Sequence, residues 1–276
     1  MDLIMRFVCL IFAVVFFSIG VGCSSPKSPP APQEVQWRNL SSYYGYLQED
    51  TVWQGKVLLD DDLIVPSGRT LTIRAGTVVF IRPSRSTKIE PEWLSSHTEL
   101  QVRGTLRVEG TRSKPVYFLP AEEPVNGDAA WSGLLFDRGA QGHVSHAVIS
   151  AAEAGVTLTD ASPIIEDSRF ERCRYGAVFQ GEGSRSLVRG NRFEQGESGL
   201  FFWWGARPRL EDNVIASNEE EGLFIDETSA PEFRGNQVWN NGIGVVSIRS
   251  DFAAEEIELE GNVISHRVFS TPGEHL

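Results

Sequence analysis

Apolar and polar residues alternate in short segments along most of the chain. Residues 71–73, 77–81, 100–102 and 105–108 follow this pattern, and glycine-containing turns lie between several of them. A period of two predicts β-strands that bury one face, whereas no window keeps the period of an amphipathic helix. Short strands joined by glycine turns are typical of a β-sandwich, a β-barrel or a β-helix.

A repeat of about 22 residues in the second half of the chain discriminates between these three architectures. Gly155, Gly176, Gly199 and Gly222 recur at this step. One turn position recurs with separations of 21, 23, 22, 23 and 26 residues, at Ala147, Ser168, Asn191, Asn213, Asn236 and Asn262. The period is too short for a propeller blade, so we predict an all-β parallel β-helix with coils of about 22 residues.

Asparagine occupies this recurrent turn in the C-terminal coils. Asn tolerates the left-handed backbone of a tight turn, and stacked amides can hydrogen bond to the coils on either side. We therefore predict a structural Asn ladder of Asn191, Asn213, Asn236 and Asn262.

Three segments add a resemblance to a known family. They are VPSGRTLTIRAGT at residues 65–77, LQVRGTL at 100–106 and WSGLLF at 131–136. Together they resemble the single-stranded, right-handed parallel β-helix proteins of the pectin-lyase-like fold, over residues 53–265. The resemblance implies a right-handed winding. It does not imply one activity, because this fold hosts lyases, hydrolases, epimerases, adhesins, scaffolds and exported lipoproteins of unassigned function.

The N-terminus predicts export and lipidation. Residues 7–19 form an apolar run that is too short for a comfortable membrane span and typical of a signal peptide. The residues Gly20, Val21, Gly22 and Cys23 resemble the lipobox of bacterial lipoproteins. That resemblance implies cleavage before Cys23 and acylation of its thiol, palmitate included, while an ordinary secretory signal is the alternative. Ser24 resembles the sorting residue of outer-membrane lipoproteins, facing either the periplasm or the cell surface.

The sequence thus divides into three parts. Residues 1–22 are the predicted lipoprotein signal peptide, residues 23–36 a lipid-anchored Pro/Ser tether, and residues 37–276 the β-helix domain with a C-terminal cap. Two excursions, 82–98 and 120–130, interrupt the regular winding. Loops that leave a solenoid commonly form one lip of its binding face.

The net charge and the cysteine content limit the possible binding partners, disulfides and metal sites. The formal charge of −12 argues against nucleic acid, whose backbone is anionic. Cys173 is the one cysteine outside the leader and the lipobox, so no internal disulfide is expected. The acidic runs 60–62 and 219–221 leave calcium binding open. Both lack the alternating ligand spacing of a calcium loop, so we expect solvated charge at turns, with no metal site and no cofactor.

The strand that follows each recurrent glycine carries the candidate binding site. Alternation turns one column of residues outward, with Phe201 and Phe224 at its centre. The candidate ligand-binding residues are Phe201, Trp203, Trp204, Phe224, Gln180 and Asp226. An exposed aromatic stripe suits stacking on sugar rings, contact with a protein, or covering by a loop or the C-terminal tail.

These features favour a non-enzymatic cell-envelope lipoprotein whose β-helix face binds a surface polysaccharide or an envelope protein. We predict no catalytic residues, because no two carboxylates fall at equivalent outward positions of neighbouring coils. The alternatives are a polysaccharide-modifying enzyme, a lyase or epimerase acting on a uronic-acid polymer, and a passive spacer.

Overall fold

The computed structural model describes residues 39–84, 88, 95–124, 127–249, 251–252 and 254–269. All of them belong to one compact unit that runs from Glu34 to Leu276. The predicted signal peptide, Cys23, the whole of the predicted tether and the tail beyond Phe269 lie outside the described residues. Within those ranges, none of the secondary-structure elements is a helix long and apolar enough to cross a membrane.

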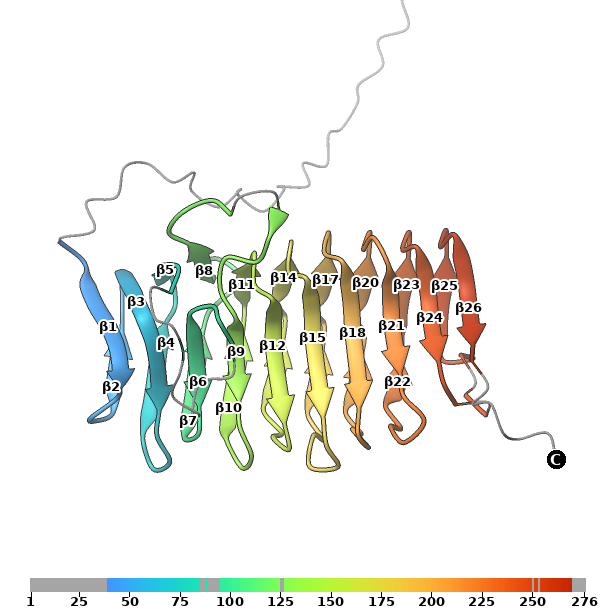
Figure 1. Ribbon diagram of the computed structural model, residues 1–276, viewed down its shortest axis with the longest axis horizontal. Coiled ribbons are helices and arrows are strands. Elements are labelled where there is room, and N and C mark those ends of the chain that lie inside the picture. Colours follow the sequence, from blue (N-terminus) through green and yellow to red (C-terminus); the bar gives the residue numbers. More distant parts are fainter. Residues whose placement is uncertain are drawn as a thin grey trace, which may run out of the picture. The chain divides into compact units, whose positions relative to one another are not determined.

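Each regular coil contributes one short strand to each of three faces of the β-helix, and the strands within a face pair in parallel (Figure 1). Face 1 contains β6 (Glu99–Val102), β9 (Gly133–Phe136), β12 (Ala154–Thr159), β15 (Tyr175–Gln180), β18 (Ser198–Trp203), β21 (Glu221–Ile225), β24 (Ile243–Ser247) and β26 (Ile264–Val268). Face 2 contains β5 (Val78–Ile81), β8 (Val116–Pro120), β11 (Ala147–Ser150), β14 (Arg169–Glu171), β17 (Arg192–Glu194), β20 (Val214–Ala216), β23 (Asn236–Trp239) and β25 (Ile257–Glu260). Face 3 contains β2 (Thr51–Trp53), β4 (Thr70–Arg74), β7 (Thr105–Glu109), β10 (Gln141–Ser145), β13 (Ile164–Glu166), β16 (Leu187–Arg189), β19 (Arg209–Glu211) and β22 (Glu232–Arg234).

Two further strands pass along two faces at the N-terminal end. Residues 56–59 of β3 (Lys56–Val65) pair with β5 on face 2, and residues 63–65 pair with β6 on face 1. Strand β1 (Ser41–Tyr46) runs parallel to β3 and shifts register in its middle. The predicted parallel β-helix is confirmed by this topology, in which each regular coil visits face 3, then face 2, then face 1.

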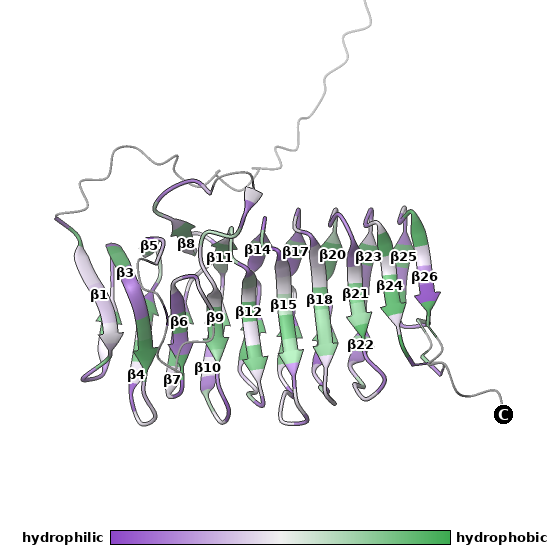
Figure 2. Cartoon of the chain, in the orientation of Figure 1, coloured by the Kyte–Doolittle hydropathy of each residue, from purple (hydrophilic) through white to green (hydrophobic). Residues whose placement is uncertain are grey.

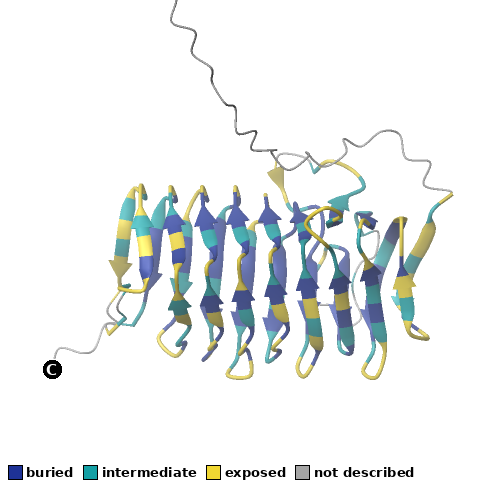
Figure 3. Ribbon diagram, turned by 180° about the vertical axis from the view of Figure 1, so that it is seen from behind, coloured by how far each residue is buried: buried dark blue, intermediate teal, exposed yellow. Residues whose placement is uncertain are grey.

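Phenylalanine rings stack on one another in the interior of the middle coils. Phe170 and Phe193 lie on consecutive face 2 strands with ring centroids 4.6 Å apart, and Phe179 and Phe202 lie on consecutive face 1 strands at 5.2 Å. All four rings are at most 1% exposed. Burying each side chain contributes on the order of 1.5–3 kcal/mol to stability. Figure 3 shows this burial along the middle coils, while strands at both ends of the stack include exposed residues.

Two of the recurrent glycines, Gly155 and Gly176, make room for the rings of face 2. A Cβ added to Gly176 would lie 2.8 Å from Cδ1 of Phe193 and 2.7 Å from the carbonyl oxygen of Gly199. Both distances are shorter than van der Waals contact allows. The regular spacing of glycines in the sequence therefore reflects close packing between face 1 and the interior side chains of face 2.

Asparagines form two ladders, and the predicted one has three of its four members. The backbone N–H of Asn191 donates to Oδ1 of Asn213 (3.0 Å), and that of Asn213 donates to Oδ1 of Asn236 (3.0 Å). Placing Asn262 in this column was wrong. It belongs to a second ladder, of Asn218, Asn241 and Asn262, in which the N–H of Asn241 donates to Oδ1 of Asn262 (2.9 Å).

The misplacement of Asn262 has a topological cause. In the described part of the segment between β24 and β25, no face 3 strand intervenes, so the chain returns directly to face 2. Asn236 therefore pairs with Ile257, and Asn262 falls in the later turn between faces 2 and 1.

The acidic run 60–62 lies within β3, which corrects its prediction as solvated turn charge. Asp60 pairs with Arg82, and Asp62 Oδ1 accepts from Lys88 Nζ (2.7 Å) with both side chains 6% exposed. Burial is the largest influence on Asp62 and raises the pKa of its carboxyl, while Lys88 opposes that shift. These acids hold the described part of the first excursion against the scaffold.

Candidate functional site

Face 1 of the middle coils alternates between interior and outward side chains, as predicted. In β18, Leu200 and Phe202 are fully buried, whereas Phe201 and Trp203 are half-buried. The register aligns Val178, Phe201 and Phe224 in one outward column. Figure 2 shows the apolar character of β12, β15, β18 and β21 on this face. Val178 is 9% exposed, so neighbouring side chains already cover that part of the column.

Four aromatic side chains form a continuous surface, which we call the aromatic stripe: Tyr175, Phe201, Trp203 and Phe224. Phe201 stacks on Phe224 with centroids 5.1 Å apart and planes inclined by 12°, and Tyr175 meets the edge of Phe201 at 5.0 Å. Trp203 lies 5.9 Å from Phe201 and 4.6 Å from Phe224. The rings therefore buttress one another and present their remaining surface to solvent.

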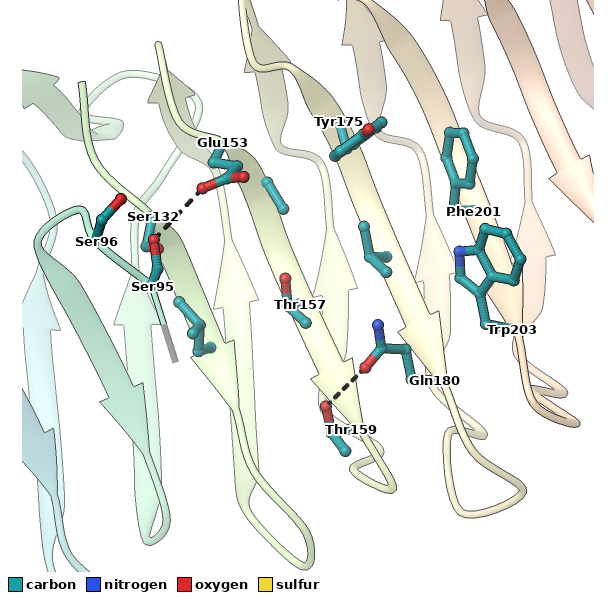
Figure 4. A pocket seen from close by; sticks show the side chains of 13 residues that line it. Ser95, Ser96, Ser132, Glu153, Thr157, Thr159, Tyr175, Gln180, Phe201 and Trp203 are labelled. Carbon is teal, nitrogen blue, oxygen red and sulfur yellow. Dashed lines mark hydrogen bonds between the residues drawn. The ribbon is translucent and has the colours of Figure 1, made fainter. Parts of the chain in front are cut away.

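Beside the stripe lies a groove of about 600 Å³, which we call the face 1 groove (Figure 4). The aromatic wall consists of Tyr175, Phe201 and Trp203. The remaining lining side chains are Ser95, Ser96, Ser132, Leu135, Glu153, Ala154, Thr157, Thr159, Val178 and Gln180. Ser95 and Ser96 come from the first excursion, which therefore forms one lip of the groove.

Gln180 is the predicted candidate that supplies a polar group to this groove. The Thr159 hydroxyl donates to Gln180 Oε1 over 3.3 Å, and Figure 4 shows the amide nitrogen pointing away from Thr159. Thr157 lies one coil from Val178 in the outward column, so a hydroxyl and an amide line the wall beside the rings. Polar groups in such positions fix the orientation of a bound ligand.

Asp226 lies outside the groove lining and its side chain is buried in the turn after β21, which differs from its predicted outward placement. Its carboxylate is buried and accepts the backbone N–H groups of Trp204 (2.7 Å), Thr228 (3.0 Å) and Ser229 (2.7 Å). Burial alone raises the pKa of Asp226, but the hydrogen bonds from Ser229, Trp204 and Thr228 outweigh it and lower the pKa below its ordinary value. The residue closes the turn after β21.

Two further candidates lie outside the groove lining. Phe224 extends the stripe by one coil and supports Trp203 from the side. Trp204 is 66% exposed and has a φ of +56° in the turn after β18. Its indole is therefore a surface group of the turn, separate from the stack.

A charged edge adjoins the aromatic wall at the turn between faces 2 and 1. Arg174 donates from Nε to Glu197 Oε2 (3.0 Å), and its Nη1 lies 4.0 Å from Glu153 Oε1. The centre of the same guanidinium lies 5.1 Å from the Tyr175 ring centroid. Burial raises the pKa of the Tyr175 phenol; Arg174 opposes this shift, and Glu197, Glu153 and Glu220 add to it. Sequence reasoning missed Tyr175, although it directly precedes Gly176 in the repeat.

The described residues hold no group of three or more His, Cys, Asp or Glu side chains arranged for a metal ion. The groove instead combines flat aromatic faces with hydroxyl, amide and carboxylate groups. This set can stack against an apolar ring face and hydrogen bond to polar substituents at its edge.

The chain is similar to solved structures at low sequence identity. A crystal structure of the periplasmic alginate epimerase AlgG is similar at 12% identity and a TM-score of 0.46, and the match covers 80% of this chain and 68% of that chain. A double mutant of the same epimerase matches at 13% identity and a TM-score of 0.45, with the same coverage. No curated protein matches the sequence. The family profile described as "Right handed beta helix region" matches residues 132–269, half of the chain, and the chain belongs to this family.

Proposed function

We propose that the face 1 groove binds a carbohydrate chain, with sugar rings stacked on the aromatic stripe. The observation that carries this proposal is the half-buried stack of Phe201, Trp203 and Phe224 beside a groove of about 600 Å³. Contiguous exposed aromatic surface on a soluble domain commonly marks an interaction site.

The chemistry of the two walls supports a sugar as the ligand. A pyranose ring has an apolar C–H face and a rim of hydroxyl groups. The rings of Phe201 and Trp203 offer the complementary apolar surface. Thr157, Thr159 and Gln180 offer hydrogen-bonding groups along the adjacent coils.

The direction of the groove favours an oligosaccharide over a single sugar. Its lining comes from β9, β12, β15 and β18, which are consecutive strands of face 1. Neighbouring strands lie about 4.8 Å apart, so the lining extends roughly 14 Å along the stack. A chain laid along the coil axis would contact each coil in turn.

The predicted anchor at Cys23 gives this activity a location. Acylation there would hold the β-helix at a membrane of the cell envelope, which we propose to be the outer membrane, with the Pro/Ser tether as a spacer. The chain would then act as a non-enzymatic lipoprotein that retains a polysaccharide near the membrane.

Affinity electrophoresis tests this function. The detergent-solubilised full chain is run in native gels that contain one envelope polysaccharide each, beside Trp203→Ala and the matched control Trp204→Asn. Asn suits the left-handed backbone at position 204. We expect at least one polysaccharide to retard the wild type and the control, and to retard Trp203→Ala less. Equal mobility of all three in every gel would refute carbohydrate binding at the groove.

A further inference from the structure

We infer that the face 1 groove takes a glycan segment that carries no carboxylate or sulfate group. This inference rests on the proposed carbohydrate binding and specifies the ligand class. It follows from the charges in and beside the groove, which would repel a polyanionic chain.

Inside the groove, the charge is negative. Among the described lining residues, Glu153 is the only one with a charged side chain, and 38% of that side chain is exposed. Its Oε2 accepts a hydrogen bond from the Ser95 hydroxyl over 3.4 Å, at the lip formed by the first excursion (Figure 4). A uronate ring stacked on Tyr175 or Phe201 would bring its carboxylate towards this acid.

The cation that contacts the aromatic wall, Arg174, is already engaged. Arg174 is held by Glu197 at 3.0 Å, lies 4.0 Å from Glu153 and covers the Tyr175 ring at 5.1 Å. Hydrogen bonding to Glu197 raises the pKa of its guanidinium further. To bind a ligand carboxylate, Arg174 would have to give up contacts with groups of this chain, so it adds little attraction for an anion.

More carboxylates lie along the same edge. Glu197 and Glu220 follow one another in the turn between faces 2 and 1, where the N–H of Glu220 donates to the carbonyl of Glu197. Glu220 is exposed; desolvation by its neighbours raises the pKa of its carboxyl, and the charges of Glu221 and Glu197 raise it as well. Among the described residues, Arg174 is thus surrounded by carboxylates of this edge, namely those of Glu153, Glu197 and Glu220.

Binding of a neutral ligand is compatible with these charges. A neutral sugar can stack on the rings and hydrogen bond to Thr159 and Gln180 without bringing a second negative charge towards Glu153. A polyuronate presents one carboxylate per ring, so several lie within a Debye length of the acidic edge at once. We expect a neutral oligosaccharide to bind at least about tenfold more tightly than a uronate of equal length and linkage in low salt.

Isothermal titration calorimetry with the full chain tests this selectivity. The probes are a neutral oligosaccharide and its C6-oxidised uronate counterpart, each in low salt and in roughly 0.5 M NaCl, where charges are strongly screened. We expect the preference for the neutral probe to shrink in high salt. Equal or tighter binding of the uronate in low salt would overturn the inference and leave carbohydrate binding intact. Binding of neither would overturn both.

Two charge-reversal variants distinguish a local effect of charge at the groove from an effect of the net charge of the chain. Glu220→Lys alters the acidic edge, and Glu232→Lys makes the same charge change on face 3, where Glu232 is exposed. We expect Glu220→Lys to raise uronate affinity about threefold and Glu232→Lys to leave it nearly unchanged. Equal effects of the two variants would contradict selection by the groove.

Discussion

The indole of Trp203 lies 4.6 Å from the ring of Phe224 on the next coil, and the two planes are inclined by 31°. Each ring restricts the motion of the other, so the Trp203 side chain loses little conformational entropy when a ligand binds. A site of this kind binds through preorganised surface.

Phe201 and Phe202 are adjacent in β18 but have opposite roles, which gives a paired prediction. Phe201→Ala should weaken carbohydrate binding by about tenfold, since one aromatic contact contributes roughly 1–1.5 kcal/mol. Phe202→Ala should leave a cavity in the interior and lower the free energy of unfolding by about 3–5 kcal/mol. Denaturant titration and affinity electrophoresis of both variants measure the two effects, and an equal loss of stability in both would contradict the assignment of faces.

The first Asn ladder should contribute strongly to stability. Asn213 accepts from Asn191 and donates to the carbonyl of Val188 (2.8 Å) and to Oδ1 of Asn236 (2.9 Å). Asn213→Ala leaves these buried partners unsatisfied and should lower the free energy of unfolding by about 2–4 kcal/mol. The exposed Gln237→Ala is the control for denaturant titration, and we expect a change under about 0.5 kcal/mol there. Similar losses in both would contradict the ladder's role.

The Asp226 carboxylate should make stability depend on pH at the acidic end. Its pKa is lower in the folded chain than in the unfolded chain, so its contribution is present above the unfolded pKa and is lost as the pH falls through the folded pKa. Asp226→Asn presents an amide N–H₂ near backbone donors and should lower the free energy of unfolding by about 1–3 kcal/mol at neutral pH. The difference between wild type and variant should shrink at low pH, and a difference that stays constant would contradict this explanation.

The thiol of Cys173 should be unreactive in the folded chain. It is buried, and burial raises its pKa from the ordinary value of 9.0 to about 12. In a Cys9→Ser/Cys23→Ser background, alkylation at pH 8 should proceed only through unfolding and accelerate with denaturant. The unfolded thiol ionises first, so the stabilising contribution is full below pH 9 and is lost as the pH rises towards 12. Rapid stoichiometric alkylation in native buffer would refute the burial.

The sequence pattern predicts the fold well because both of its signals have direct physical causes. A period of two places Phe201 and Phe202 on opposite sides of one strand. The recurrent glycine marks points where face 1 packs closely against an interior side chain of face 2, as Gly176 does against Phe193 and Gly199 against Ile215. Such restraints repeat in every coil, so they are visible in the chain itself.

The site is less predictable because it depends on local turns and on neighbours from distant segments. The turn that contains Thr228 and Ser229 engages the carboxylate of Asp226, which the alternation alone would direct outward. Tyr175 contributes from the position before the glycine, a column that the strand pattern does not single out. The Ser95 lip is brought in by contacts of the acidic run in β3, far away in sequence.

The position of a bound oligosaccharide tests the central claim most directly. A co-crystal structure with a carbohydrate that retards the chain in affinity electrophoresis should show a sugar ring in van der Waals contact, about 4 Å, with Phe201 or Trp203, and hydroxyl groups near Gln180. A sugar bound on face 2 or face 3, with the face 1 groove empty, would contradict the account.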